Sequence, residues 1–570
     1  MPLSQLRCVL LILLFSGNVL PAAAARTIDN FALLDHRGKS HELDYYLRAE
    51  GIRGIVLFVQ GNGCPLVRKR IPELQRLRAA YEPRGILFAM LNANPQDGRD
   101  EVAEEAERFQ IDVPILMDEA QLAAGMLGVQ RTAEAFLISA GSKEIVFRGP
   151  IDDRLGYQSE KPQAEREFLR EALDAFLAGE PVEPAEVDAP GCLIAMPEAG
   201  PAISYAGRIA PVLLENCVRC HVEGGIGPFA LSSYAKVRGW SKMIREVLLT
   251  RQMPPWQADP HHGDFANGRS LHPEEQAALV HWIDAGCPRG DGPDPLAGRE
   301  PSHNRWALGE PDALIDIGEQ HIPAEGILDY RYAMVESPFQ EDTWISAVDV
   351  KPGNPSVLHH VIASIYVKDD KGEWTGRRHL AGYAPGMGAS KCPQGSGILV
   401  PGGAHFRFQL HYTVSGREET DRSQLALYTA DGPLEREYHT GVAIHSRFRI
   451  PPGAMEYEQM KENAIQRDIL LYAMNPHMHF RGKWMCYEAH YGDGRVETLL
   501  SVPNYNFNWQ RDYELAEPKR LPAGTKLVVR GAWDNSPMNL HNPDPNRAVG
   551  WGEQTFDEMF FASYRFVDAD

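Results

Sequence analysis

Apolar and polar residues follow two different periods over residues 26–186. Short apolar runs, which predict buried strands, occupy 54–60, 85–93, 113–117, 135–138 and 144–147. Apolar positions that repeat every three or four residues predict helices over 68–81, 99–110, 121–127 and 164–177. Strands that alternate with helices in this way indicate an α/β domain.

The pattern changes after this block. Residues 181–201 are rich in Pro, Glu and Ala, which is typical of a linker, and we place the linker at 187–202. Helical periodicity at 209–216 and after Pro273 predicts an all-α domain over 203–298. From 303 onward, short alternating strands with Pro-Gly turns predict two all-β, jelly-roll-like sandwiches over 303–438 and 439–570. The chain is therefore expected to be multidomain.

The first 25 residues have the features of a signal peptide. Arg7 precedes a short apolar run at 8–15, and small residues follow Pro21. The run is too short to span a bilayer, and no other long apolar segment follows. We therefore expect an exported protein, periplasmic or extracellular, without a membrane span. The balance of 57 basic against 77 acidic residues argues against a nucleic-acid partner.

Cys64 follows the first predicted strand and begins a predicted helix, whose N-terminus favours a thiolate. The order of strand, turn, cysteine and helix resembles thioredoxin-like and peroxiredoxin-like (redoxin) domains, here over 26–186. Two features depart from that pattern: Val67 replaces the second cysteine of a Cys-x-x-Cys pair, and Ala133 replaces the usual proline after Thr132. Cys192 could serve as a distant partner. Either a working thiol catalyst or a structural module fits these residues.

Cys217-Val218-Arg219-Cys220-His221 is the strongest motif in the chain. In an exported protein this spacing is the attachment signature of one c-type haem, with two thioethers and a proximal histidine. A zinc site is the alternative, but the chain near the motif lacks a second ligand pair. The block resembles single-haem cytochrome c modules of bacterial oxidoreductases.

Met253 is the candidate distal haem ligand. It stands in a loop ordered by two following prolines, and a thioether there would raise the haem potential. Met243, His261 and His262 compete for this role.

Histidines cluster at three places in the predicted sandwiches. His405 and His411 share one strand face but lie about 20 Å apart, so one metal cannot bind both. His411 stands near the end of its strand, where sites are usually built.

The other histidines occur in close pairs. His477 and His479 lie on the same strand face at a separation of about 6–7 Å, which suits one metal. His359 and His360 are adjacent, so they point to opposite faces and can share a metal only at a bulge or a strand end.

The order of these clusters resembles the copper type II monooxygenases, which include the peptidylglycine and dopamine β-monooxygenases. The motifs that carry the resemblance are Leu358-His359-His360, Gln409-Leu410-His411-Tyr412, His477-Met478-His479-Phe480-Arg481-Gly482 and Gln554-Thr555-Phe556-Asp557-Glu558-Met559. The resemblance implies two coppers. His359, His360 and His411 would hold the electron-transfer copper, and His477, His479 and Met559 the oxygen-activating one. Met538 is a competing thioether.

The resemblance implies hydroxylation of a substrate C–H bond with O2. The electrons would come from ascorbate or an electron-transfer protein, and here through the haem; the small-molecule or peptide substrate is unknown. His477, His479, Met559 and Cys64 are then the candidate catalytic residues. Two alternatives stay open: a copper and haem electron-transfer protein that does not oxygenate, or a thiol-dependent peroxide or disulfide redox protein.

Two further expectations concern packing. Cys392 and Cys486 are candidates for a disulfide in an oxidising compartment. The connection at 297–305 is short, so the predicted cytochrome domain is expected to lie near the first sandwich.

Overall fold

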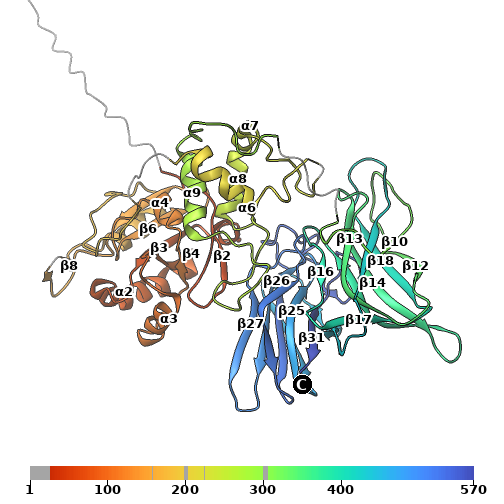
Figure 1. The fold of residues 1–570 in the computed structure, drawn as a ribbon. Helices are drawn as coiled ribbons and strands as arrows, with labels where there is room; N and C mark the ends of the chain where they lie inside the picture. The colour runs from red at the N-terminus through yellow and green to blue at the C-terminus, as the bar shows by residue number, and fades with distance from the viewer. Residues whose placement is uncertain (1–25, 157, 198–202, 224, 299–305, 570) are drawn as a thin grey trace, which may run out of the picture.

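The structure is a computed structural model that describes residues 26–156, 158–197, 203–223, 225–298 and 306–569. The predicted signal peptide lies outside the described residues. An α/β domain, a helical segment and two β-sandwiches follow one another along the chain (Figure 1).

The N-terminal domain is built on a five-stranded sheet in the order β5-β4-β3-β6-β7. Strands β3, β4 and β5 are parallel, and β6 and β7 are antiparallel to their neighbours. The sheet strands are β3 (Gly54–Gln60), β4 (Ile86–Asn92), β5 (Ile115–Met117), β6 (Ala135–Ser139) and β7 (Ile145–Gly149), and the main helices are α2 (Pro65–Tyr81), α3 (Arg99–Arg108), α4 (Leu122–Leu127) and α5 (Phe168–Ala178). Every residue of β3 is buried, as its apolar sequence requires. The predicted α/β domain is confirmed.

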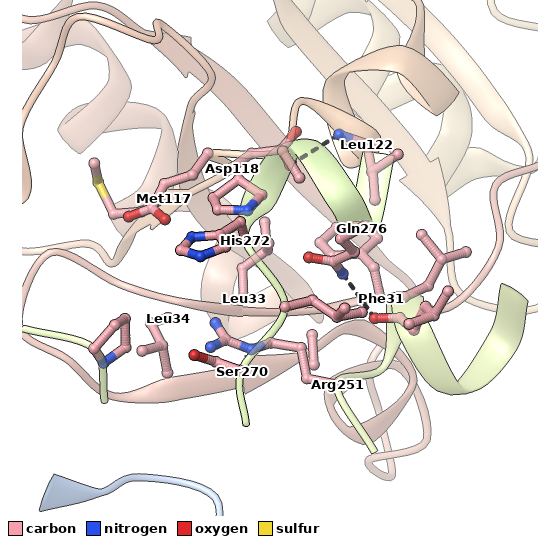
Figure 2. Close-up of a pocket in the computed structure, with 18 of the residues that line it drawn as sticks. Phe31, Leu33, Leu34, Met117, Asp118, Leu122, Arg251, Ser270, His272 and Gln276 are labelled. Carbon is pink, nitrogen blue, oxygen red and sulfur yellow. Dashed lines mark hydrogen bonds between the residues drawn. The ribbon is translucent and has the colours of Figure 1, made fainter. Parts of the chain in front are cut away.

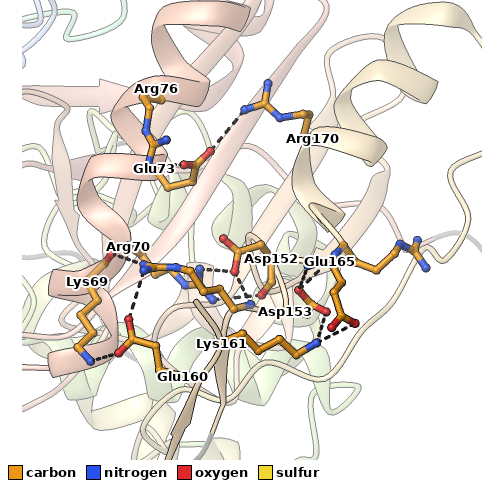
Figure 3. Close-up of polar contacts among 12 residues, drawn as sticks. Lys69, Arg70, Glu73, Arg76, Asp152, Asp153, Glu160, Lys161, Glu165 and Arg170 are labelled. Atoms are coloured by element: carbon orange, nitrogen blue, oxygen red, sulfur yellow. Dashed lines mark hydrogen bonds and ion pairs between the residues drawn. The ribbon is translucent and has the colours of Figure 1, made fainter. Parts of the chain in front are cut away.

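Short elements complete this domain: β1 (Ala32–Leu34), β2 (Ser40–Glu42), α1 (Leu43–Leu47), the turn η1 (Glu82–Arg84), β8 (Leu155–Gly156) and β9 (Ser159–Glu160). The β8–β9 hairpin is joined to α2 by a polar network (Figure 3). In this network the buried Arg70 guanidinium pairs with Asp152, and Lys69 pairs with Glu160 at 2.6 Å. The network therefore attaches the hairpin to the main helix.

The helical segment packs on the N-terminal domain. Its elements are η2 (Tyr205–Ile209), α6 (Ala210–Asn216), α7 (Tyr234–Gly239), α8 (Ser241–Leu249) and α9 (Pro273–Asp284). Leu213 and Trp282 of this segment belong to the same hydrophobic core as Phe31, Leu57 and Leu122 of the α/β domain. The two parts thus share one core, in agreement with their adjacent positions in Figure 1.

Each β-sandwich consists of two layers with its own core, and the layers are antiparallel except for the parallel pair of β17 and β21. One layer of the first sandwich contains β10 (Ala313–Asp316), β20 (Gln424–Thr429), β13 (Thr343–Lys351), β17 (Ser396–Val400) and β21 (Arg436–Glu437), with β16 (Ser390–Lys391). The facing layer contains β12 (Arg331–Glu336), β18 (His405–Tyr412), β14 (Leu358–Lys368) and β15 (Trp374–Tyr383). One layer of the second sandwich contains β22 (His439–Ile444), β31 (Phe561–Asp568), β25 (Ile469–His477) and β28 (Tyr513–Leu521). The facing layer contains β24 (Tyr457–Ala464), β29 (Lys526–Trp533), β26 (Gly482–His490) and β27 (Val496–Val502). Two small pairs, β11 (Gln320–Ile322) with β19 (Glu419–Asp421) and β23 (Arg449–Ile450) with β30 (Val549–Gly550), lie beside them.

The loop between α8 and α9 makes backbone contacts with the second sandwich. The N–H of Asp259 donates to the carbonyl of Ser501 and the N–H of Ala266 to that of Glu514, both at 2.8 Å. The segment contacts the first sandwich, as expected, because Arg269 donates to the carbonyl of Gly386. Its loop also pairs with the edge of β28 in the second sandwich, which the sequence did not predict.

The proposed disulfide between Cys392 and Cys486 is not formed. Cys392 packs near the carbonyl of Ile345 in the first sandwich, whereas Cys486 lies on β26 of the second. Among the described residues, no helix has the length and apolar character that crossing a bilayer requires.

Candidate functional site

Cys64 and Cys192 form a close thiol pair. Their sulfur atoms are 3.5 Å apart, although the residues are 128 positions apart in the chain. Cys64 directly precedes helix α2 and is 5% exposed, whereas Cys192 is exposed. Burial and the adjacent Cys64 sulfur raise the pKa of Cys192. The separation exceeds a disulfide bond length of about 2.05 Å, so a small approach of the two sulfurs would join them.

The segment around Cys192 is held against the loop before β6. The N–H of Thr132 donates to the carbonyl of Cys192, and the N–H of Cys192 donates to Thr132 Oγ1, both at 2.9 Å. The same Oγ1 lies 3.2 Å from Cys64 Sγ. A Cβ on Gly191 would fall 1.5 Å from the carbonyl oxygen of Thr132, so only glycine allows this approach. Part of the predicted linker is therefore docked onto the domain.

Charged groups surround Cys64. The Arg68 guanidinium, one turn into α2, pairs with Glu105 at 2.5 Å, and the same carboxylate accepts from the N–H of Gly63. The pKa of Arg68 is raised, first by Glu105 and in part by the charge of Cys64. The Arg68 guanidinium and the N-terminus of α2 therefore place positive charge on the same side of Cys64.

The haem-attachment motif presents its ligands in a usable form. Cys217 and Cys220 are free, and burial raises the pKa of Cys217 to about 12. His221 Nδ1 lies 2.9 Å from the carbonyl oxygen of Phe229, to which it can donate. That hydrogen bond fixes the ring and leaves Nε2 for an iron ion, the arrangement common in metal-ligating histidines. The donor set therefore fits a covalent haem.

Met253 lines a cavity of about 270 Å³ between the α/β domain and the helical segment (Figure 2). Phe31, Leu122 and Arg251 also line it. Among the described residues, His221 does not line this cavity, so the cavity does not bring Met253 and His221 together. The role of Met253 as the distal ligand stays a prediction.

Its rivals are placed less suitably for a haem. Met243 is 44% exposed. His261 and His262 both face the buried Arg99–Asp259 ion pair, whose Nη1–Oδ2 distance is 2.7 Å.

His359, His360 and His411 come together as a buried trio. One nitrogen from each lies within 4.8 Å of the others. The pairing of β14 with β18 shifts register between Leu358 and His360, and this bulge turns two adjacent histidines toward one point. Nδ1 of His411 is buried and has no hydrogen-bond partner among the described residues. An unpaired buried nitrogen in such a trio fits a bound metal ion.

His477 and His479 form the second pair, with ring centroids 5.3 Å apart. Nδ1 of His477 lies 2.7 Å from Gln510 Oε1, which fixes that ring. Nδ1 of His479 faces the carbonyl of Asp557 at 3.3 Å, while its Nε2 is buried and has no partner among the described residues. This unpaired nitrogen again fits a metal ligand.

Met559 is carried next to this pair by its neighbour Glu558. One carboxylate oxygen of Glu558 accepts from the backbone N–H of His479 at 3.0 Å, and the other accepts from that of Arg481 at 2.6 Å. The segment bearing the predicted thioether is thus fixed beside His479, while the role of Met559 itself stays a prediction.

All five imidazoles are held neutral. Burial lowers the pKa of His359 and His477 to about 4 and that of His411 and His479 to about 3; the pKa of His360 lies well below its usual value. Neighbouring imidazoles lower these values further for His359, His360, His411 and His479. Neutral imidazoles are the form that binds metals.

Phe507 connects the two histidine groups and was not anticipated from the sequence. Its ring stacks on His359 at 4.8 Å and contacts His479 edge-on at 5.7 Å. Gln510 and Thr132 were also missed, because single polar residues in irregular segments have no periodic signal. His405, by contrast, lies away from the trio and packs on Trp374, as the six-residue spacing predicted.

Comparisons with known proteins concern the thiol domain. Residues 24–146 match the model of the AhpC/TSA family. The chain is 27% identical over 121 residues to the thiol-disulfide oxidoreductase ResA of Geobacillus thermodenitrificans, which covers 21% of this chain and 66% of that protein. Residues 24–146 are thus an AhpC/TSA-type, thioredoxin-like domain, followed by a large β-rich region.

Solved structures were compared as well. An uncharacterized conserved protein from Geobacillus kaustophilus is 27% identical, with a TM-score of 0.27, over 31% of this chain and 93% of that one. A putative thiol:disulfide interchange protein DsbE from Chlorobium tepidum is 17% identical, with a TM-score of 0.20, over 27% of this chain and 95% of that one.

Proposed function

We propose that this protein carries out thiol–disulfide exchange through Cys64 and Cys192. The observation that carries the proposal is the 3.5 Å separation of the two sulfurs on a thioredoxin-like domain. The similarity to a thiol-disulfide oxidoreductase supports the same chemistry. The missing Cys-x-x-Cys partner is thereby supplied from 128 residues downstream.

The accessible sulfur is Cys192, so exchange begins there. An external thiolate RS⁻ attacks Cys192 in the Cys64–Cys192 disulfide; a Cys192–S–S–R bond forms, and Cys64 leaves with the electron pair as a thiolate. A second RS⁻ attacks the sulfur of R, RS–SR forms, and Cys192 leaves and takes up a proton. Two external thiols are oxidised and the protein disulfide is reduced to two thiols. The reverse steps reduce an external disulfide.

The surrounding residues support this order. The N-terminus of α2 and the Arg68 guanidinium place positive charge beside Cys64, the sulfur that leaves with the electron pair in the first step. The raised pKa of Cys192 keeps the released sulfur protonated. The Thr132 hydroxyl lies against the Cys64 sulfur and accepts from the backbone N–H of Cys192, so one group positions both cysteines.

Peptide mapping of the full chain tests the proposal. Mild oxidation should yield a peptide cross-linked through Cys64 and Cys192, and reduced glutathione should cleave it. In Cys64→Ser, oxidised glutathione should leave glutathione trapped on Cys192 as a mixed disulfide, because the Cys64 thiol that would displace it is gone. In Cys192→Ser the buried Cys64 should react slowly. Cys486→Ser, on the distant β26, is the control and should behave as the unsubstituted chain. An oxidised chain without the cross-link would contradict the proposal.

A second function is favoured by the buried imidazoles: a copper-dependent oxidoreductase, and specifically a C–H monooxygenase. The trio of His359, His360 and His411 and the pair of His477 and His479 offer neutral nitrogens, two of them unpaired among the described residues. Copper held there would supply one-electron chemistry and O2 activation. The protein's own contribution is to orient these rings, through Gln510 and the β14 bulge, and to exclude water around them.

In this second function the electrons would arrive from ascorbate or a redox protein through a haem on Cys217, Cys220 and His221. The oriented His221 ring supports that attachment. Covalent haem is attached outside the cytoplasm, so this function goes with export to the periplasm or beyond, which the sequence of residues 1–25 favours.

Metal analysis tests the copper assignment without relying on turnover. The unsubstituted chain should bind two coppers, and His411→Ala and His477→Ala should each bind one. His405→Ala is a matched control, because His405 lies on the same strand as His411 but outside the trio. Two coppers in both ligand variants would exclude these ligands. Haem that stays on the denatured chain, and is lost in Cys217→Ser/Cys220→Ser, tests the attachment separately.

A further inference from the structure

Two arginines from different parts of the chain meet at one backbone carbonyl. Arg269 lies in the loop between α8 and α9 of the helical segment, and Arg511 precedes β28 of the second sandwich. Each donates through Nη1 to the carbonyl of Gly386, in the first sandwich, at 3.3 Å. Gly386 has φ +81°, and a Cβ there would lie 2.7 Å from Arg511 Nη2. The glycine therefore lets the guanidinium approach the loop.

Arg511 is buried with most of its donors unused. It is 4% exposed, and its Nε and Nη2 are buried and have no hydrogen-bond partner among the described residues. The adjacent carboxylate of Asp512 is already occupied, because it pairs with Arg565 at 2.8 Å and accepts from Asn475 at 3.0 Å. A buried guanidinium without an anion is costly, so the arrangement is incomplete without one.

The electrostatics agree with a missing anion. Burial and the charge of Arg511 lower the pKa of Arg269 to about 10, and burial lowers that of Arg511. Cys220 of the haem-attachment motif lies near enough for its charge to act on both arginines. The two guanidiniums thus converge beside the point where a porphyrin would be attached.

We propose that Arg511 and Arg269 form a carboxylate-binding site at the junction of the helical segment and the two sandwiches. Guanidinium groups bind planar carboxylates through paired N–H donors, and both Nε and Nη2 of Arg511 are open for such a pair. Two sources could supply the carboxylate: a propionate of a haem bound at Cys220, or a free carboxylate ligand. The first source rests on the second function proposed above; the site itself does not.

The first arm of the test uses the haem-bearing full chain. Arg511→Gln removes the charge, Arg511→Lys retains it without the paired geometry, and Arg530→Gln removes an exposed arginine on β29 as the control. If a propionate occupies the site, the haem midpoint potential should fall in Arg511→Gln, because a nearby positive charge that favours the reduced haem is lost. It should fall less in Arg511→Lys and stay unchanged in Arg530→Gln.

The second arm uses acetate as the probe, titrated calorimetrically into the haem-bearing chain and into Cys217→Ser/Cys220→Ser. A free-carboxylate site should bind acetate in both chains, about tenfold more weakly in Arg511→Gln and Arg269→Gln, with no change in haem potential. A propionate site should bind acetate in the haem-free chain alone. If the chain carries no covalent haem, the proposed copper- and haem-dependent function is wrong. The acetate titration still shows whether the two arginines bind a carboxylate. The proposal is overturned if the arginine substitutions change neither the haem potential nor the binding of acetate.

Discussion

Closing the Cys64–Cys192 disulfide should stabilise the thioredoxin-like domain strongly. The two cysteines enclose most of the five-stranded sheet, since they lie 128 residues apart. In the chain-entropy description, a cross-link over a loop of that length removes enough entropy from the unfolded chain to add about 5 kcal/mol at 25 °C. The sulfurs already lie 3.5 Å apart, so little native distortion opposes the bond.

Hydrogen exchange read by mass spectrometry measures this effect locally, which matters in a chain of several domains. Amides of β3 and β6 should exchange about four thousandfold more slowly in the oxidised chain than in the reduced one, since about 1.4 kcal/mol corresponds to a factor of ten. In Cys192→Ser the same oxidation should leave their exchange unchanged. Equal exchange in oxidised and reduced chains, with the cross-link verified by peptide mapping, would refute the reasoning.

Three further outcomes follow from buried contacts. Arg99→Ala should cost about 3–5 kcal/mol, because it removes the guanidinium that pairs with the buried Asp259 and leaves this carboxylate to the neighbouring histidine rings. Burial acts to raise the pKa of Asp259, but His261 and Arg99 outweigh it and hold the pKa below its usual range. The stability that the ionised Asp259 contributes is therefore present above about pH 4 and is lost as the pH falls. Denaturation curves at about pH 7 and about pH 3.5 measure this loss. Arg70→Ala should destabilise the N-terminal domain by a similar amount and Arg70→Met by less, as measured by urea unfolding. Gly191→Ala should displace the docked segment and abolish the Cys64–Cys192 cross-link on oxidation, as peptide mapping would detect.

The sequence predicts the N-terminal domain well because its elements are long and strictly periodic. Strand β3 is a run of seven buried residues, and α2 carries its buried side chains at helical spacing. The sequence could only suggest the docking of Cys192, since that docking depends on two backbone hydrogen bonds in an aperiodic, Pro-rich segment. The expected disulfide between Cys392 and Cys486 fails because sequence reveals cysteine number and not which sandwich each occupies.

The histidine groups show the same division. Strand periodicity correctly separates His405 from His411, and it states the condition under which His359 and His360 can converge. The bulge that meets this condition arises from the pairing of β14 with β18, which no local pattern encodes. The ring of Phe507, which touches both groups, comes from a loop with no periodic signal.

Unpaired buried polar atoms connect the proposed sites. Folded proteins pair nearly all such atoms, so their exceptions call for an explanation. Among the described residues they occur near Cys64, at Asn62 and Glu105, and again at His411, His479 and Arg511. Further members of the set are Gln60, Arg68, His405 and Glu134. The unpaired atoms of His411, His479 and Arg511 belong to side chains that the sequence motifs, their burial or their convergence on one point identify as candidate ligand-binding groups. A bound metal cation would satisfy the unpaired imidazole nitrogens, and a carboxylate would satisfy the unpaired N–H donors of Arg511. The lack of partners for buried polar atoms therefore predicts a cation at one site and an anion at the other.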